Sequence, residues 1–309
     1  MKKVFIRAIV FAVTAVNLIF FNIACIATYP ERIRYDVTIN LASFNLRYNS
    51  ELDLDVRSWA YRRDYVYEYL LSLDKDIICM QEVNENQYLD LAQGIGEKYN
   101  IIYYDRDTVQ NPEGLAICYD KEKFTLIKEG IFWLSETPHK VSIGWEAICH
   151  RICVTALLKH NESGKYFDVY NVHLDSQDEL ARNEGIKLVM NKVKDSSFPS
   201  IVCGDMNGRV TDRWYEIATE TMLDCQAVAE NTEFGCTFNG WGENCENITE
   251  GEKDTRAIDF CFVSKEFKVS DFEILQDKIR DGEYYSDHFM VATRITFTYF
   301  ELKEEESKK

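Results

Sequence analysis

The stretch Ser200-Ile201-Val202-Cys203-Gly204-Asp205-Met206-Asn207 places a short apolar run directly before two polar residues. An apolar run of this length that ends in turn-forming residues is typical of a strand buried on both faces. Side chains alternate along an extended chain, so Asp205 and Asn207 face one way and Met206 faces the other. Gly204 allows close approach of the backbone, and ligands of α/β proteins gather at strand ends. The stretch therefore predicts an α/β fold with a polar site at this strand end.

Further segments of the chain end in polar residues in the same way. We expect a buried strand before each of them, so that one cleft collects their polar side chains. For any one segment alone, a surface carboxylate or a plain Asx turn is the alternative interpretation. The segments are Ser43-Phe44-Asn45-Leu46-Arg47, Gln81-Glu82-Val83, Asn171-Val172-His173-Leu174-Asp175 and Ser286-Asp287-His288.

Strand-like and helix-like patterns alternate along the rest of the chain. Apolar residues recur at helical spacing from Trp59 to Leu73 and from Ala181 to Val193, which predicts two helices. Residues 115–119 and 131–134 are expected to form a hairpin around the charged turn 120–123. Connections by both helices and hairpins favour mixed sheets with helices outside them. Other strands are expected at 37–45, 76–81, 167–174, 201–203, 258–263 and 290–297.

The N-terminus has the layout of a secretory signal. Lys2, Lys3 and Arg7 precede an apolar stretch, residues 8–26, with few polar interruptions. Lipidation at Cys25 and an uncleaved membrane anchor are the alternatives to signal cleavage. We therefore expect a protein that is secreted, periplasmic or attached to the cell envelope.

A single domain accounts for the remainder, because no composition break, repeat or low-complexity linker follows the leader. No obligate protein partner is evident, and we expect a monomer. The expected parts are a signal peptide or lipoprotein/membrane anchor at 1–27, one domain at 28–300 and a charged tail at 301–309.

The ten cysteines do not resemble the framework of a disulfide-rich domain. Cysteines within apolar runs behave as small buried hydrophobes and are expected to be free. They are Cys79, Cys118, Cys203 and Cys261. One bridge could form among Cys225, Cys236 and Cys245, which lie in polar sequence, and Cys149 and Cys153 share one face of a strand-like segment. No paired Cys-x-x-Cys or His partner supports a structural zinc site.

Several longer motifs occur in a fixed order along the chain. They are Asn-x-Arg-Tyr at 45–48, Phe-Trp-Leu-Ser-Glu-Thr-Pro at 132–138, Gly-Trp-Glu-Ala at 144–147, Thr-Phe-Asn-Gly at 237–240 and Arg-x-Ile-Asp-Phe at 256–260. From about Val37 to about Thr298, the chain resembles the endonuclease/exonuclease/phosphatase superfamily of metal-dependent phosphoesterases. Within it, the chain is similar to the bacterial branch related to deadenylase and nocturnin catalytic domains. The resemblance implies a four-layer α/β sandwich, with two face-to-face mixed β-sheets flanked by helices.

The chemistry of phosphate ester hydrolysis agrees with this resemblance. The reaction needs a hard cation, a group that orients or deprotonates water, and a donor for charge on the leaving oxygen. Mg²⁺ takes one or two carboxylates and keeps several waters, so Glu82 beside the amide of Asn45 suits it. The resemblance implies that Glu82 binds Mg²⁺ or Mn²⁺ and that Asn45 supports the metal and the phosphate.

The resemblance also implies catalytic roles for residues near the chain's other strand ends. Asp205 activates or orients the attacking water, and Asn207 holds the phosphate in the transition state. His288 stabilises developing charge or shuttles the proton. Asp287 belongs to the same site and also contacts the metal in some accounts of the family. A carboxylate near an imidazole favours the imidazolium form and fixes its orientation.

Four further residues are assigned by their match to the family. His173 faces the phosphate, and Asp259 orients or ligates at the metal side. Arg47 and Arg151 could each form a bidentate fork on a phosphate, and a salt bridge within an acidic protein is the alternative for both. The bacterial branch named above usually has His where Ser176 stands here, which alters how the substrate is held without touching the metal ligand. Substrate choice is expected to depend on residues 241–254.

The net charge of −17 bears on the substrate. An acidic surface repels polyanions, because nucleic-acid affinity comes mainly from neutralising phosphates with Lys and Arg. We therefore expect an exported divalent-metal-dependent phosphoesterase that favours a small-molecule or lipid-headgroup substrate, either a phosphodiester or a phosphomonoester. The first alternative is a deadenylase-like nuclease acting on RNA or DNA. The second is a non-catalytic surface binding module, which would lack at least one of the residues needed for chemistry, and none is missing.

Overall fold

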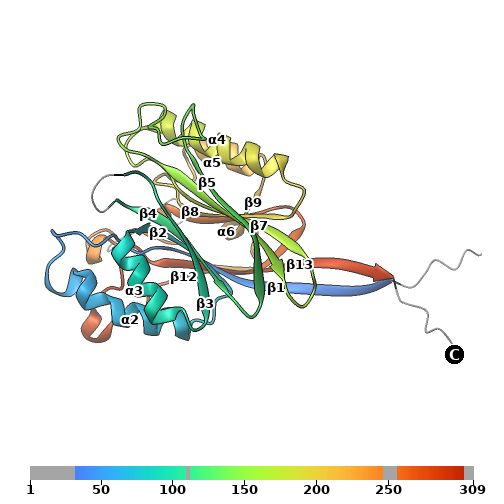
Figure 1. Ribbon diagram of the computed structural model, residues 1–309, viewed down its shortest axis with the longest axis horizontal. Coiled ribbons are helices and arrows are strands. Elements are labelled where there is room, and N and C mark those ends of the chain that lie inside the picture. Colours follow the sequence, from blue (N-terminus) through green and yellow to red (C-terminus); the bar gives the residue numbers. More distant parts are fainter. Residues whose placement is uncertain (1–31, 109–111, 246–255, 303–309) are drawn as a thin grey trace, which may run out of the picture. The chain divides into compact units, whose positions relative to one another are not determined.

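Two β-sheets lie at the centre of the computed structural model, which describes residues 32–108, 112–245 and 256–302 (Figure 1). The larger, seven-stranded sheet has the order β10 (Asn231–Thr232), β12 (Phe267–Leu275), β13 (Met290–Leu302), β1 (Arg32–Asn45), β2 (Ile77–Val83), β4 (Gly114–Asp120) and β3 (Tyr99–Asp105). The six-stranded sheet has the order β5 (Phe124–Trp133), β6 (Ile152–His160), β7 (Tyr166–His173), β8 (Ser200–Asp205), β11 (Asp259–Val263) and β9 (Leu223–Asp224). Both are mixed, since β1–β2 and β7–β8 pair in parallel while β2–β4 and β6–β7 pair antiparallel.

Helices cover the outer face of each sheet (Figure 1). On the larger sheet, α2 (Trp59–Ser72) and α3 (Glu85–Ile95) bury apolar residues at helical spacing, such as Val66 and Leu70, against Phe44 and Met80. On the smaller sheet, α4 (Glu179–Asp195) and α5 (Arg213–Thr219) pack on β7, β8 and β11. The predicted four-layer sandwich and the two predicted helices are confirmed. Short elements complete the chain: α6 (Cys225–Val228) and the 3₁₀ turns η1 (Asp55–Arg57), η2 (Gly240–Gly242) and η4 (Arg280–Gly282).

A buried polar bridge joins the two sheets where they face each other. Asn171 on β7 donates from Nδ2 to the main-chain oxygens of Met80 on β2 (2.8 Å) and Ala116 on β4 (2.9 Å). Gln81 Nε2 in turn donates to Asn171 Oδ1 at 2.8 Å. Buried polar groups are destabilising unless they are hydrogen-bonded, so this network favours one alignment of the sheets. Gln81, next to Glu82, thus helps to hold the two sheets in the alignment that the site requires.

The predicted hairpin of residues 115–119 and 131–134 is wrong. β4 belongs to the larger sheet and β5 to the smaller one, so the chain passes from one sheet to the other at residues 121–123. Asp120 Oδ1 accepts the main-chain N–H of Glu122 at 2.9 Å, which stabilises a tight turn there. A tight turn between two strands is compatible with either a hairpin or a change of sheet, and only the pairing decides between them.

The cysteines follow the sequence expectations in part. Cys236 and Cys245 form the bridge, and Cys225 is free and buried. The four cysteines of the apolar runs are free and buried, as expected. Cys149 lies in the loop before β6 while Cys153 lies within that strand, so they do not share a strand face.

The main compact unit spans residues 36–297. A second unit comprises residues 1–35 and 298–309, and within its described part Tyr35 stacks on Tyr299 with ring centroids 5.3 Å apart. The predicted leader at 1–27 lies outside the described residues, as do most of the predicted tail and residues 246–255. Among the helices of the described chain, none is long and apolar enough to span a membrane.

Candidate active site

The register of strand pairing brings the predicted site residues together at one edge of both sheets, the edge that the strand ends form. In the smaller sheet, His173 at the end of β7 pairs with Asp205 at the end of β8, and Asp205 pairs with Asp259 at the start of β11. In the larger sheet, Asn45 at the end of β1 pairs with Gln81 on β2. These edges border a cavity of about 400 Å³. The position of each residue in the cleft therefore follows from backbone pairing.

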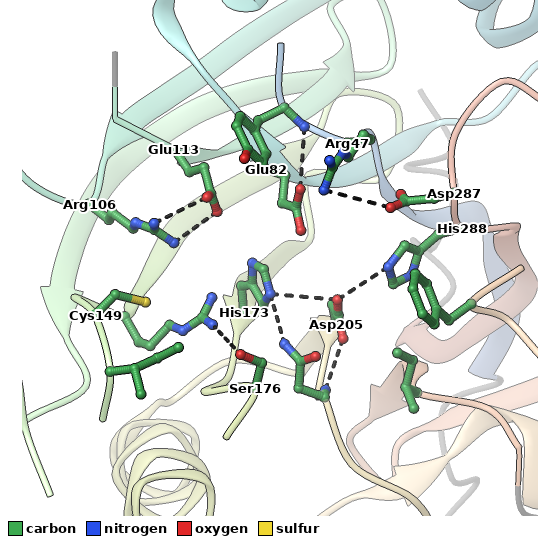
Figure 2. Close-up of a pocket in the computed structure, with 16 residues that line it drawn as sticks. Arg47, Glu82, Arg106, Glu113, Cys149, His173, Ser176, Asp205, Asp287 and His288 are labelled. Carbon is green, nitrogen blue, oxygen red and sulfur yellow. Dashed lines mark hydrogen bonds and ion pairs between the residues drawn. The ribbon is translucent and has the colours of Figure 1, made fainter. Parts of the chain in front are cut away.

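Glu82 reaches the cavity from a bulge within β2, rather than from beyond the strand's end as the sequence predicted. The pairing of β2 with β4 shifts register between Gln81 and Val83, and Glu82 has a φ of 58°. A bulge of this kind re-aims a side chain, and a left-handed non-glycine residue marks stored strain at functional sites. Figure 2 shows the Glu82 carboxylate pointing into the centre of the cavity. The strain at this position is thus associated with placing a carboxylate in the cleft.

Glu82 is held among other acidic groups. Its oxygens accept hydrogen bonds from Asn45 Nδ2 (3.2 Å) and the main-chain N–H of Tyr48 (3.3 Å). Burial first, and then the carboxylates of Glu113 and Asp287, raise the pKa of Glu82 to about 7. Excess negative charge around a carboxylate is the environment that a divalent cation relieves.

Asn45 connects the two sheets at the site. Its Nδ2 donates to Glu82 and also to Asp205 Oδ2 at 3.0 Å, while its Oδ1 accepts the main-chain N–H of Arg47 at 3.0 Å. In this arrangement the amide nitrogen faces the carboxylates and the amide oxygen faces the backbone. Asn45 therefore positions Glu82 and Asp205 relative to each other, and its direct contact with a metal stays a prediction.

Asp205 lies between two histidines. Its Oδ2 is 3.6 Å from His173 Nε2 and 3.8 Å from His288 Nε2, and its Oδ1 accepts the main-chain N–H of Asn207 at 2.9 Å (Figure 2). Burial and then the nearby Asp259 carboxylate raise the pKa of Asp205 to about 6. A carboxylate with a pKa near 6 is ionised at neutral pH and is a better base than an ordinary Asp.

The two histidines have opposite protonation states. Burial lowers the pKa of His288, but the carboxylates of Asp259, Asp205 and Asp287 outweigh it and raise the value to about 10. Its Nδ1 donates to Asp259 Oδ2 at 2.9 Å. Burial and the nearby arginines Arg151 and Arg106 instead hold the pKa of His173 well below its usual range. At neutral pH the cleft thus pairs an imidazolium with a neutral imidazole.

Asn207 fixes the tautomer of His173. Asn207 Nδ2 lies 3.1 Å from the main-chain oxygen of Leu174, which can only accept, and 2.9 Å from His173 Nε2. The amide nitrogen therefore donates to both, which makes Nε2 of the neutral ring an acceptor and leaves the proton on Nδ1. Asn207 itself has a φ of 47°, a second left-handed residue in the cleft. His173 consequently offers a neutral N–H donor.

The residues predicted to bind a phosphate border the same cavity. Arg47 Nε and Nη2 donate to Asp53 at 2.8 and 3.1 Å, and its Nη1 is 3.9 Å from Asp287 Oδ2. Arg151 Nη2 donates to Ser176 Oγ at 3.5 Å. The buried strand expected before Asp287 and His288 is wrong: both residues lie in the loop that precedes β13, an inner strand of the larger sheet. All the predicted site residues except Asn45 and Asp259 line the cavity, and those two contact residues that do.

Two cleft residues were missed by the sequence reasoning. Arg106 donates from Nη1 and Nη2 to Glu113 at 2.8 and 3.1 Å, and both line the cavity (Figure 2). Glu113 directly precedes β4, which runs antiparallel to β2, so the start of β4 lies beside the end of β2. Searching only the ends of apolar runs overlooks such positions. A carboxylate directly before an apolar run is the signal that would have found Glu113.

The donors present fit a hard divalent cation. Ligand atoms of Glu82, Glu113 and His173 lie within 4.8 Å of one another, as do those of Asp205, Asp259 and His288. Asp259 Oδ1 is buried and has no hydrogen-bond partner among the described residues, so it has an unused acceptor. Carboxylate oxygens are the ligands that Mg²⁺ and Mn²⁺ prefer. Protonated His288 cannot serve as a ligand, so the carboxylates, Glu82 first among them, are the groups that would hold the ion.

Comparisons with known proteins match this architecture. The sequence family described as the Endonuclease/Exonuclease/phosphatase family matches residues 37–288. A family protein from Bacteroides thetaiotaomicron is 30% identical, with a TM-score of 0.78 over 85% of this chain and 99% of that one. A mannosyl-6-phosphatase from the same species is 30% identical, with a TM-score of 0.76 over 83% of this chain and 99% of that one. Human nocturnin is 20% identical over 79% of this chain and 60% of its own length.

Coverage differs between the two kinds of relative. The chain spans about 60% of the first curated relative that it matches, an uncharacterised mimivirus protein, and 26% of Drosophila nocturnin. It spans nearly the whole of the two bacterial structures. The bacterial structures are therefore the better guide to how this chain folds as a unit.

Proposed function

The chain belongs to the endonuclease/exonuclease/phosphatase family, and on that basis we propose that it is a divalent-metal-dependent hydrolase of phosphoric esters. One observation carries the proposal. Asn45, His173 and His288 converge on the Asp205 carboxylate at 3.0 to 3.8 Å, and Glu82 faces the same cavity from the other sheet. A base, a charged donor, a neutral donor and a metal ligand thus meet in one cleft.

Different residues of the cleft carry out different parts of the hydrolysis. Asp205 orients a water molecule and accepts its proton, since its raised pKa is close to neutral. The His288 imidazolium, fixed by Asp259, stabilises negative charge that develops on the reacting phosphate. His173 Nδ1–H donates to a phosphate oxygen without adding charge. A divalent cation held by Glu82 would neutralise the nonbridging oxygens of the phosphate.

We favour a small phosphomonoester or phosphodiester, such as a sugar phosphate or a lipid headgroup, as the substrate. The net charge of −17 disfavours a long polyanion. The similarity to a bacterial mannosyl-6-phosphatase along nearly its whole length supports the same class. Fold alone does not decide between substrates, so this choice rests on charge and on that neighbour.

A nuclease is the second candidate, and one feature of the cleft favours it. Phe238 lines the cavity with its ring centroid 4.9 Å from that of His288, and Tyr48 also lines the cavity. Aromatic rings beside a phosphate site can stack on bases. The sequence similarity to the 3'-5'-exoribonuclease subunit Ccr4 of Candida glabrata, 24% identical over 58% of this chain, supports the same candidate.

Release of phosphate or alcohol from a panel of esters tests the proposal. The panel comprises a hexose 6-phosphate, nucleotides, phosphoinositides, sphingomyelin and oligonucleotides, each with Mg²⁺, with Mn²⁺ and with EDTA. We expect metal-dependent turnover of at least one small ester, lost in Glu82→Gln and kept in Glu85→Gln, an exposed residue at the start of α3. Equal turnover by Glu82→Gln and the native chain, or none on any ester, would refute the proposal.

We also propose that the protein is exported through its N-terminal segment. The bridge between Cys236 and Cys245 supports an oxidising compartment outside the cytosol. Fractionation of bacteria that express the full chain should recover it outside the cytosol. Recovery of a chain with an intact leader and free thiols in the cytosol would contradict export.

A further inference from the structure

Arg47 and Arg151 were both predicted to bind a phosphate, but their surroundings differ. The Arg47 guanidinium makes two short hydrogen bonds to Asp53 and also faces Asp287. It lies over the ring of Tyr48, 4.8 Å from the centroid. These carboxylates offset its charge, and Asp53 accepts from its Nε and Nη2. Arg47 is therefore a support for the loop after β1 more than a free anion binder.

Arg151 is more deeply buried but far less well bonded. Only 6% of the residue is exposed. Its hydrogen bond to Ser176 Oγ is long at 3.5 Å, and its Nε has no hydrogen-bond partner among the described residues. A buried donor without an acceptor is costly, and a buried charge more so. The guanidinium fork of Arg151 thus has donors available for a ligand.

The nearest carboxylate does not meet this need. Asp175 Oδ2 lies 3.5 Å from Arg151 Nε, which is an ion-pair distance without hydrogen-bond geometry. The oxygens of Asp175 already accept main-chain N–H groups at 2.9 to 3.3 Å. Those groups belong to Ile148, Gln177 and Asp178. Asp175 therefore balances part of the charge of Arg151 without accepting a hydrogen bond from its Nε.

Arg151 lies at the end of the cleft away from the reacting groups. It lines the cavity together with Ser176, Cys149 and Arg106. Figure 2 shows Arg106 and Cys149 on the far side of His173 from Asp287 and His288. Arg106 is bound in bidentate fashion to Glu113, so those two charges offset each other. Among the described residues that line this end, Arg151 is the arginine that makes no hydrogen bond to a carboxylate.

We propose that Arg151, with Ser176, forms a second anion subsite beside the reacting phosphate. The substrate then carries a second phosphate or a carboxylate, which accepts from the guanidinium fork while the first phosphate is cleaved. The subsite binds and orients, and no bond is made or broken there. This inference rests on the proposed function for the reacting phosphate, whereas the binding of an anion to Arg151 does not.

Paired substrates that differ by one anion test the catalytic part. A hexose 6-phosphate is compared with the hexose 1,6-bisphosphate and with 6-phosphogluconate, which separates a second phosphate from a carboxylate. The dinucleotide ApA is compared with pApA for the phosphodiester case. We expect kcat/KM to be about 10- to 100-fold higher for the doubly charged member, and Arg151→Met to abolish that preference through KM. Arg151→Lys, which keeps the charge and loses the fork, should restore part of it.

Arg182→Met is the matched control. Arg182 donates to the main-chain oxygen of Asp175 at 3.1 Å from α4 and does not line the cavity. The Arg182→Met variant should keep the native preference for the doubly charged substrate. A preference that is unchanged in Arg151→Met, or a rate that falls equally for both members of each pair, would overturn the subsite.

A binding measurement separates this inference from the proposed function. Titration of pyrophosphate and of inorganic phosphate into the full chain in EDTA, followed by calorimetry, requires no turnover. We expect pyrophosphate to bind more tightly than phosphate, and Arg151→Met to remove the difference. Equal binding of both anions by the native chain and by Arg151→Met would refute the subsite even if hydrolysis is found. Absent turnover with Arg151-dependent pyrophosphate binding would refute the hydrolase and keep the subsite.

Discussion

At one end of the cleft the polar side chains stand on paired strands, whereas at the other end they stand on the connections between strands. His173, Asp205 and Asp259 occupy consecutive positions across β7, β8 and β11, so ladder hydrogen bonds fix their spacing. Arg106 and Glu113 flank the connection between β3 and β4. The strand-borne end holds the groups that chemistry requires. The loop-borne end is free to vary, which suits a region that selects the substrate.

Removal of one charge at the strand-borne end should have the largest effect. Asp205→Asn changes the charge of the carboxylate and hardly any volume, and it removes the proposed base. We expect kcat to fall about 10²- to 10⁴-fold on a verified substrate, with unfolding by urea little changed. Asp212→Asn, which makes the same change at a partly buried residue directly before α5 and outside the cavity, is the control. A folded Asp205→Asn protein with native turnover would remove Asp205 from the mechanism.

The next test removes the hydrogen bonds that hold the two sheets in one alignment. Asn171→Ala deletes the bridge between the sheets and removes one buried hydrogen bond each from Gln81 and from the main-chain oxygens of Met80 and Ala116. The free energy of unfolding should fall by about 3 to 5 kcal/mol, since the lost buried hydrogen bonds and a cavity both contribute. Equilibrium unfolding in urea measures it.

Asn161→Ala is the comparison for that variant. Asn161 donates to the main-chain oxygen of Glu122 in an exposed loop at 2.7 Å. Its loss should lower the free energy of unfolding by less than about 1 kcal/mol, because water replaces the lost bond. Similar losses of unfolding free energy for the two variants would mean that the bridge between the sheets contributes no more to stability than an exposed hydrogen bond does.

The same contrast explains how much the sequence could predict. Asn45, His173 and Asp205 end apolar runs, so periodicity placed them at strand ends and the register then brought them together. Glu82 lines the cavity, but it lies within β2 rather than at the strand's end, because a bulge leaves no mark on the apolar pattern. Residues that come directly before an antiparallel strand, such as Glu113, follow no apolar run, so a search of the ends of such runs overlooks them. Pairing between distant segments decides these positions, and local patterns do not contain it.

Asp224 is a buried acid outside the cleft, and it tests whether burial by itself raises the pKa of a carboxylate in this protein. Asp224, which is 3% exposed, accepts hydrogen bonds from Tyr215 Oη (2.8 Å) and the main-chain N–H of Gln226 (3.0 Å). Burial raises its pKa from 3.8 to about 6, against the lowering effect of these bonds. Because the folded-state pKa is the higher one, its contribution to stability is fully present below pH 3.8 and is lost as the pH rises through about 6.

Asp224→Asn stays neutral and keeps an acceptor for the Gln226 N–H. Relative to the native chain, this variant should therefore gain about 1 to 2 kcal/mol of unfolding free energy between pH 5 and pH 8. Urea unfolding of both proteins at the two pH values measures the difference. A difference that does not change with pH would mean that Asp224 is not the source of a raised pKa.

The smallest effect is expected at the loop-borne end. Glu113→Gln keeps the size of the side chain but removes its charge, so the paired Arg106 loses its ionic partner. The pair is only partly buried, with side chains 18% and 19% exposed, so the free energy of unfolding should fall by no more than about 1 kcal/mol. The Glu113 carboxylate also raises the pKa of Glu82, so the change should lower that pKa. Turnover should stay within about tenfold of the native value, since Glu113 touches none of the groups proposed to move a proton. A loss as large as that of Asp205→Asn, measured on the same substrate at saturating metal, would place Glu113 in the chemistry and erase the distinction between the two ends.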